Sequence, residues 1–227
     1  MTRTTLVKYA VLGMAALSLS ACVNVLPKTE PVQLYRFGYA PGGERSGGAS
    51  PMMLSQQTAI NLGQIEFPQE SGGDRVTTTE NNQVTYVAGA RWAAPARQLF
   101  TEAVRDGFSR SATTVRLDPR GPVSAVYRLD LNVSRFESAY SRGKPTVMVA
   151  LDARVIRLSD RVVVGQRFVT AEVPVKRSDM SMMAEAYDQA TSQAIVDLVD
   201  FTQATVSANP LPDTKVTVPP PPPPPAK

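Results

Sequence analysis

The sequence predicts an α+β fold in which two amphipathic helices pack on one face of an antiparallel β-sheet. Two observations lead to this prediction. Apolar and polar residues alternate along several long segments, as they do in strands that bury one face. At Ala93, and again near Met180, the apolar period changes from two residues to about 3.6, which is the period of a helix. The apolar stripes of two helices and the apolar face of a sheet whose other face is solvated are most simply buried against one another. We therefore expect a single domain over residues 32–206.

The first residues are typical of a targeting segment. Arg3 and Lys8 give a positive start, and the apolar run that ends at Leu19 is shorter than the roughly 20 residues that a bilayer span needs. Two small residues then precede Cys22, the only cysteine of the chain. The motif Leu19-Ser20-Ala21-Cys22 resembles the lipobox of bacterial lipoproteins.

The lipobox resemblance implies a signal peptide over residues 1–21 and acyl chains, such as palmitate, on the thiol and the new amine of Cys22. Several buried acyl chains anchor a protein stably, whereas one chain anchors it only marginally. Residue 23 is Val, not the Asp that retains many such lipoproteins in the inner membrane. We therefore expect a lipid anchor in the outer membrane, a periplasmic domain, and a short tether over residues 22–31.

The first half of the domain reads as strands followed by a helix. Strands are expected over residues 32–37, 58–67, 75–79 and 82–92, and the Gly-rich residues 38–50 read as a loop. A helix is expected over residues 94–110, with Pro95 in its first turn. Its predicted buried face consists of Ala96, Leu99, Phe100, Ala103, Val104, Gly107 and Phe108.

The second half repeats this order with longer elements. Residues 127–136, 146–158 and 161–175 alternate and are joined by short turns, which predicts three neighbouring antiparallel strands. A long helix is expected from Met180 to Val206. Its predicted stripe is Met183, Ala186, Tyr187, Ala190, Ala194, Ile195, Leu198 and Val199. Residues 207–227 form a Pro-rich tail whose seven consecutive prolines predict a polyproline II rod of about 22 Å.

Composition excludes several classes of function. The chain contains no histidine, which rules out Ser-His-Asp and Cys-His catalysis and His-ligated zinc. The formal charge of +4 is scattered among acidic residues without a basic run, so a nucleic-acid partner is not expected. We expect no enzyme, no metal and no cofactor other than the lipid on Cys22.

One carboxylate pair remains as a catalytic alternative. Asp130 and Asp152 lie on the polar faces of adjacent predicted strands, as the two acids of a glycosidase would. Arg128 and Arg154 flank them on the same faces. Cross-strand ion pairing on a solvated face is therefore the more economical interpretation.

One segment carries a family resemblance. The run Tyr86 to Val104, "YVAGARWAAPARQLFTEAV", resembles the Tyr…Arg-Trp-Ala-x-Pro segment of the ABC-type transport auxiliary lipoprotein family. Further matches, in the same order, are "LPKTEPVQLYRFG", "YRLDLNVSRFES", "ALDARVIRL" and "MAEAYDQATSQAIVDLV". The resemblance covers nearly all of residues 22–205, and it excludes the Gly-rich insertion and the proline tail.

The family resemblance implies a non-enzymatic part of an intermembrane lipid-transport system. Its partners would be a periplasmic protein of the MCE (mammalian cell entry) type, an inner-membrane permease and an ATPase, with phospholipid as the cargo and a homo-oligomer left open. Arg91, Trp92 and Phe136 are the candidate partner-binding or structural residues. The alternative is a structural or assembly lipoprotein that tethers the outer membrane to the cell wall, which the proline tail favours slightly.

Overall fold

The computed structural model describes residues 31–38, 57–117 and 125–210, and every element in them belongs to the compact unit Gln33–Lys227. The strands are β1 (Gln33–Tyr35), β2 (Thr58–Glu66), β3 (Arg75–Glu80), β4 (Gln83–Trp92), β5 (Val115–Leu117), β6 (Tyr127–Ser141), β7 (Lys144–Arg157) and β8 (Val162–Pro174). The helices are α3 (Ala96–Ser111) and α4 (Met180–Ala208). Neither of these helices combines the length and the hydropathy that crossing a bilayer requires.

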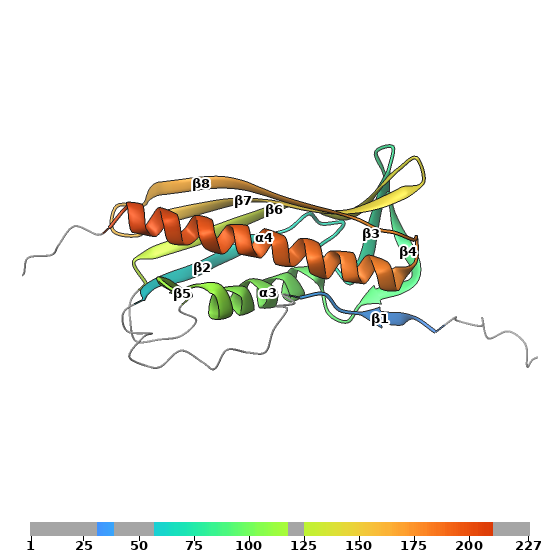
Figure 1. Ribbon diagram of the computed structural model, residues 1–227, viewed down its shortest axis with the longest axis horizontal. Helices are drawn as coiled ribbons and strands as arrows, with labels where there is room; N and C mark the ends of the chain where they lie inside the picture. Colours follow the sequence, from blue (N-terminus) through green and yellow to red (C-terminus); the bar gives the residue numbers. More distant parts are fainter. Residues whose placement is uncertain (1–30, 39–56, 118–124, 211–227) are drawn as a thin grey trace, which may run out of the picture. The chain divides into compact units, whose positions relative to one another are not determined.

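The α+β prediction is confirmed, but the sheet is mixed, not antiparallel throughout (Figure 1). Strands β6, β7 and β8 form the predicted antiparallel series, and β3 pairs antiparallel with β4. Strand β6 also pairs in parallel with β2 and with β3, and the short strands β5 and β1 pair in parallel with β2 and β4. The parallel pairs arise because β2 and β3 precede α3, and the chain returns through this helix before it forms β6.

Strand β6 is the centre of the sheet. Its whole length pairs with β7 on one side. On the other side, its first half pairs with β2 and its last residues pair with β3, so these two strands follow one another along the same edge. The loop of residues 67–74 joins them and leaves the sheet at this point. This arrangement gives the loop its place beside α3.

A bulge in β6 changes which residues face the core. Up to Val133 the buried residues are odd-numbered, as predicted from the alternation. The register with β7 shifts between Val133 and Arg135, and Phe136 then takes the buried position. A bulge inserts one unpaired residue, so the faces of the strand exchange beyond it.

Both helices bury the faces that the sequence predicts. All seven predicted residues of α3 are buried, and so is the whole predicted stripe of α4. Helix α3 begins two residues later than expected, at Ala96, and Pro95, which was predicted to lie in its first turn, is its N-cap. Near its C-terminal end, α4 approaches β8 closely: a Cβ on Gly165 would lie 2.5 Å from Cγ2 of Thr205.

Residues 33–38, which begin with β1, lie at the edge of the sheet, and we call them the strap. Strand β1 pairs only with β4, and the carbonyl of Tyr35 accepts the Ala93 N–H (2.7 Å). Phe37 follows and is buried in the core. The Gly38 N–H then donates to Oδ1 of Asp188 on α4 (2.7 Å). Strand β1, Phe37 and Gly38 thus fasten this segment to the sheet, the core and α4.

Candidate functional site

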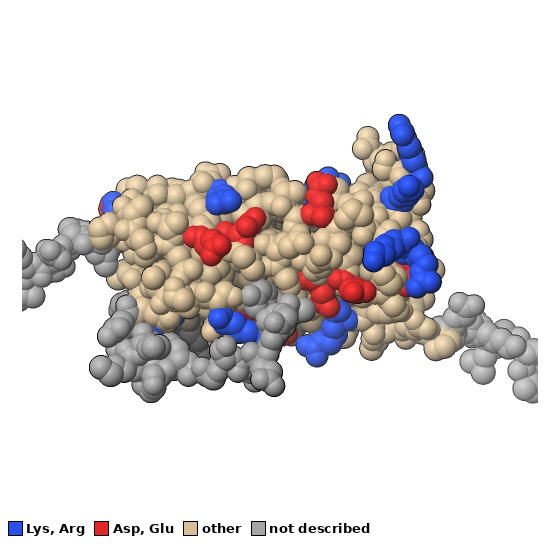
Figure 2. All heavy atoms as spheres, viewed as in Figure 1, with Lys and Arg blue, Asp and Glu red and all other residues tan. Residues whose placement is uncertain are grey.

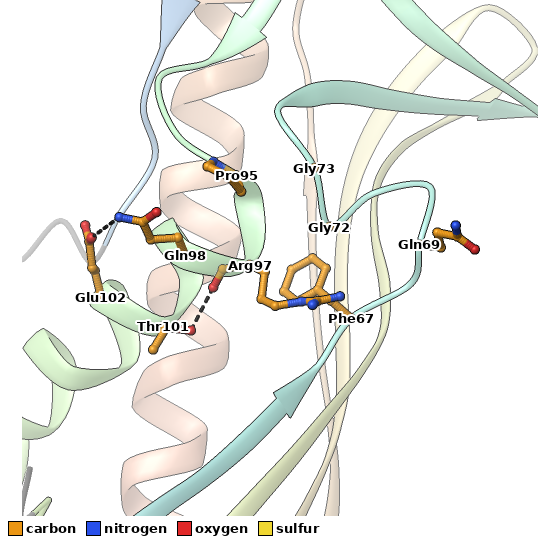
Figure 3. Close-up of a pocket in the computed structure, with 9 residues that line it drawn as sticks. All are labelled: Phe67, Gln69, Gly72, Gly73, Pro95, Arg97, Gln98, Thr101 and Glu102. Carbon is orange, nitrogen blue, oxygen red and sulfur yellow. Dashed lines mark hydrogen bonds between the residues drawn. The ribbon is translucent and has the colours of Figure 1, made fainter.

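A pocket of about 690 Å³ lies between the β2–β3 loop and the first two turns of α3 (Figure 3). It is lined by Phe67, Gln69, Gly72, Gly73, Pro95, Arg97, Gln98, Thr101 and Glu102. Its volume falls within the range of about 300–1,000 Å³ that is typical of ligand sites, and it is open to solvent. We therefore treat it as the candidate binding site of the described domain.

Backbone hydrogen bonds tie the pocket loop to the start of α3. The Ala96 N–H donates to the Gly73 carbonyl (2.8 Å), and the Arg97 N–H donates to the Gly72 carbonyl (3.3 Å). These bonds satisfy two of the N–H groups that a helix N-terminus leaves free, so this helix end is closed to an anion. Gly72 has little room for a side chain, because a Cβ there would lie 3.1 Å from the Pro68 carbonyl oxygen.

The polar groups of the pocket suit binding more than catalysis. Arg97 forms no ion pair with a described residue, and Figure 3 shows its side chain beside Phe67. The Thr101 hydroxyl donates to the Arg97 carbonyl (2.7 Å), and Gln98 donates to Glu102 (3.1 Å). Because the Thr101 proton is directed at a backbone carbonyl and not at a base, the hydroxyl is not set up as a nucleophile. The pocket offers one cation, one carboxylate, amides, a hydroxyl and an apolar floor.

The structure separates the three residues that the sequence singled out. Arg91 is exposed, and its Nη1 lies 2.9 Å from Oδ2 of Asp74, the last residue of the pocket loop. Trp92 and Phe136 are each only 2% exposed. In the described domain, Arg91 is therefore accessible to a partner, whereas the two aromatic side chains are not.

Trp92 and Phe136 belong to an aromatic cluster at the centre of the core. The cluster consists of Phe37, Phe67, Trp92, Phe100, Phe136 and Tyr187. The Trp92 and Tyr187 rings meet edge to face at 5.0 Å between centroids, and the Phe136 and Tyr187 rings lie 4.9 Å apart. Burial raises the pKa of Tyr187 well above its usual value, so this hydroxyl stays protonated. The cluster joins the strap, the sheet and both helices, and Phe67 extends it to the floor of the pocket.

Each acid of the carboxylate pair lies beside an arginine. Asp130 Oδ1 lies 2.9 Å from Nε of Arg128, and Asp152 Oδ2 lies 3.9 Å from Nε of Arg154. Gln166 also donates to both oxygens of Asp152 (3.0 Å each). These ion pairs join residues of the same strand, so the prediction of cross-strand pairing is wrong in that detail. Side chains two residues apart in a strand share a face, which brings each arginine beside its own acid.

The remaining predicted site residue lies outside the residues that the structure describes. Cys22, the predicted lipidation site, is not among the described residues, and neither is most of the Gly-rich loop or the proline tail. Within the described ranges, no three His, Cys, Asp or Glu side chains come together as metal ligands. Sequence reasoning missed the pocket, because its two walls lie more than twenty residues apart and only the Gly-Gly pair and Pro95 mark them.

Comparison with known families identifies the chain. The model of the ABC-type transport auxiliary lipoprotein component matches residues 46–199. The chain belongs to this family. Membership makes it an auxiliary lipoprotein of an ABC transport system, and it indicates a membrane-anchored place in the cell envelope. The matched range includes the pocket, the whole of both β6 and β7, and most of α4.

Solved structures show the same fold. A crystal structure of the protein XCC0632 from Xanthomonas campestris is similar, with a TM-score of 0.64 and 22% sequence identity, over 78% of this chain and 97% of that one. An uncharacterised protein gives a TM-score of 0.57 and 14% identity, over 75% of this chain and 98% of that one. At these identities the likeness concerns the fold alone. No match was found among the curated proteins.

Proposed function

We propose that this family member is a non-catalytic, outer-membrane-anchored component of an intermembrane phospholipid-transport system of the MCE type. It would hold the docking or receiving end of a conduit that includes an MCE protein, an inner-membrane permease and an ATPase. The family description supports an association with ABC transport. The lipobox at Cys22 supports the anchor, and Val23 supports passage to the outer membrane.

The observation that supports a docking role, as opposed to an enclosed lipid site, is the filled interior of the domain. Six aromatic rings, most of them less than about 6 Å from a neighbouring ring, occupy the space between the sheet and the helices. The described pocket is open and borders this core without entering it. A phospholipid could not be enclosed by such a packed interior without displacing it. The domain would therefore act through its surface and its position.

The proposal is tested by comparing a variant that lacks the membrane anchor with variants that lack one carboxylate. Cys22→Ala should leave a folded but unanchored chain that fails to restore the barrier function of the outer membrane. Asp130→Asn and Asp152→Asn should retain that function, because Asp130 pairs with Arg128, and Asp152 with Arg154 and Gln166, so both acids already serve surface contacts. The wild-type chain should cross-link to an MCE protein, and mass spectrometry should find acyl chains on Cys22.

Two results would contradict the proposal. Full barrier function from Cys22→Ala, together with its loss in either aspartate variant, would indicate a soluble enzyme that uses carboxylates. Cross-links to the cell wall in place of an MCE protein would favour the structural tether instead.

A further inference from the structure

Three turns of the chain meet at one end of the domain, which we call the hairpin end. It comprises residues 80–83 at the β3–β4 turn, residues 141–145 at the β6–β7 turn and residues 175–179 before α4. The two hairpins are neighbours because Glu80 pairs with Tyr140. The third turn joins them through the Val175 N–H, which donates to the Pro145 carbonyl (2.9 Å). In Figure 1 all three turns lie at the right-hand side.

The hairpin end carries unpaired positive charge. Arg142, Lys144 and Lys176 are exposed, and none of them forms an ion pair with a described residue. Figure 2 shows Lys and Arg side chains projecting at this side of the molecule. Arg142 has a φ of 51°, in a two-residue turn where Asn or Gly is strongly preferred. The sequence thus places a long cationic side chain where local conformation does not favour one.

The acids of these turns do not neutralise the three cations. Asp179 caps α4 by accepting the Met182 N–H (2.9 Å), and its carboxylate lies 3.6 Å from Arg177. Glu80 is the other acid of the three turns. Four cations therefore face two acids, and the hairpin end keeps a net positive charge.

The chain also enters the domain at this side. Strand β1 lies at the right-hand side of Figure 1, as the hairpins do, and it pairs in parallel with the last residues of β4 (Gln33 with Ala90). From Cys22 to Gln33 the chain spans at most about 40 Å when fully extended. The fourteen residues of β7, which separate the β6–β7 turn from the β7–β8 turn, measure about 46 Å. A lipid on Cys22 would keep the hairpin end within reach of a membrane but would not by itself orient the domain.

We propose that the hairpin end is a membrane-contact surface that binds the headgroups of anionic phospholipids. Each Lys or Arg near an anionic surface favours contact about fivefold, and the effect decays within a Debye length. Arg142, Lys144 and Lys176 would thus orient the anchored domain with β6 and β7 pointing away from the bilayer. This inference rests on the proposed anchor and not on the proposed transport role.

Site-specific labelling of the full acylated chain in vesicles tests this surface. With Cys22 acylated, a cysteine introduced at Ser141 or at Ser159 carries the only free thiol. Ser141 lies at the hairpin end, and Ser159 lies in the β7–β8 turn at the far end of β7. In vesicles with phosphatidylglycerol, energy transfer from the label to headgroup acceptors should be several-fold stronger from position 141 than from position 159.

A matched pair of triple variants distinguishes the effect of the hairpin-end cations from the effect of the net charge of the chain. Replacing Arg142, Lys144 and Lys176 by Gln should remove the difference between the two positions, as should neutral vesicles or 0.5 M salt. The control replaces three exposed cations elsewhere, namely Arg105, Arg161 and Arg167, by Gln and should preserve the difference.

Equal energy transfer from positions 141 and 159 would overturn the proposal. So would a difference between them that is the same in anionic and in neutral vesicles. The chain that begins at Val23 provides a second test, because it needs no anchor. It should co-sediment with anionic vesicles more than with neutral ones, and the hairpin-end variant should lose this preference. None of these measurements uses barrier function, so a failure of the transport role would be seen separately.

Discussion

Truncating Phe37 to alanine tests whether the aromatic cluster holds the strap to the domain. Phe37 is 4% exposed, and its ring lies 4.9 Å from Trp92 and 4.8 Å from Phe136. A buried Phe removes at least about 150 Å² from water, which at about 25 cal/mol per Å² gives ~4 kcal/mol. The two close ring pairs would add to this loss, and collapse of the strap into the space would reduce it. We expect the free energy of unfolding to fall by about 3–5 kcal/mol.

Urea unfolding of the chain that begins at Val23 measures this loss. Trp92 is the only tryptophan, and its ring touches that of Phe37, so its fluorescence reports on the site directly. Leu34→Ala is the control, because Leu34 lies on the same strap but is 66% exposed, and it should change stability by less than about 0.5 kcal/mol. A loss below about 1 kcal/mol for Phe37→Ala, or equal losses for both variants, would refute the reasoning.

Three further predictions concern the sheet and α4. Leu131→Ala and Leu151→Ala should each destabilise the domain by about 2–5 kcal/mol in urea unfolding, because both side chains are buried on the helix side of the sheet. Gly165→Ala should lower the melting temperature, and Thr205→Ala in the same chain should restore part of it, because the new Cβ would lie 2.5 Å from the threonine methyl. Burial raises the pKa of Asp188 above its usual value, so its ionisation costs stability once the pH rises above the pKa of the unfolded chain. Asp188→Asn should therefore be the more stable protein at pH 7, with a difference from wild type that shrinks as the pH falls through the raised pKa; a constant difference would contradict this assignment.

Local periodicity was enough to predict the elements whose one face is buried. The stripe of α3 is one example, since each residue from Ala96 to Phe108 takes the side that a period of 3.6 assigns to it. Strand β7 is another, because its partners on both sides are antiparallel and adjacent in sequence. Strand β5 escaped prediction because its three residues are too few to show an alternation. The parallel pairing of β2 with β6 could not be predicted either, because periodicity says which face is buried and not which strand is the neighbour.

The candidate site was less predictable, since it depends on what the fold brings together. Trp92 stood out through the family resemblance, but nothing local distinguishes a core indole from one that contacts a partner. The bulge after Val133 decides that Phe136 faces inward, and a strict alternation would have turned it outward. Arg97 lies outside the predicted buried face of α3, and its pocket exists because residues 67–74 fold back onto that helix.

The strap has a mechanical consequence if the N-terminus carries the proposed lipid anchor. Any tension on the tether reaches the domain through β1. This strand is hydrogen-bonded to β4, and Phe37, two residues beyond it, packs in the core. When the pull follows the strand axis, the bonds between β1 and β4 carry the load together in shear instead of opening one after another. The Phe37 ring behind them resists extraction, because leaving the core would expose its surface to water. Brief strain between membrane and partner could thus be borne by the strap, while β6, β7 and α4 keep their shape.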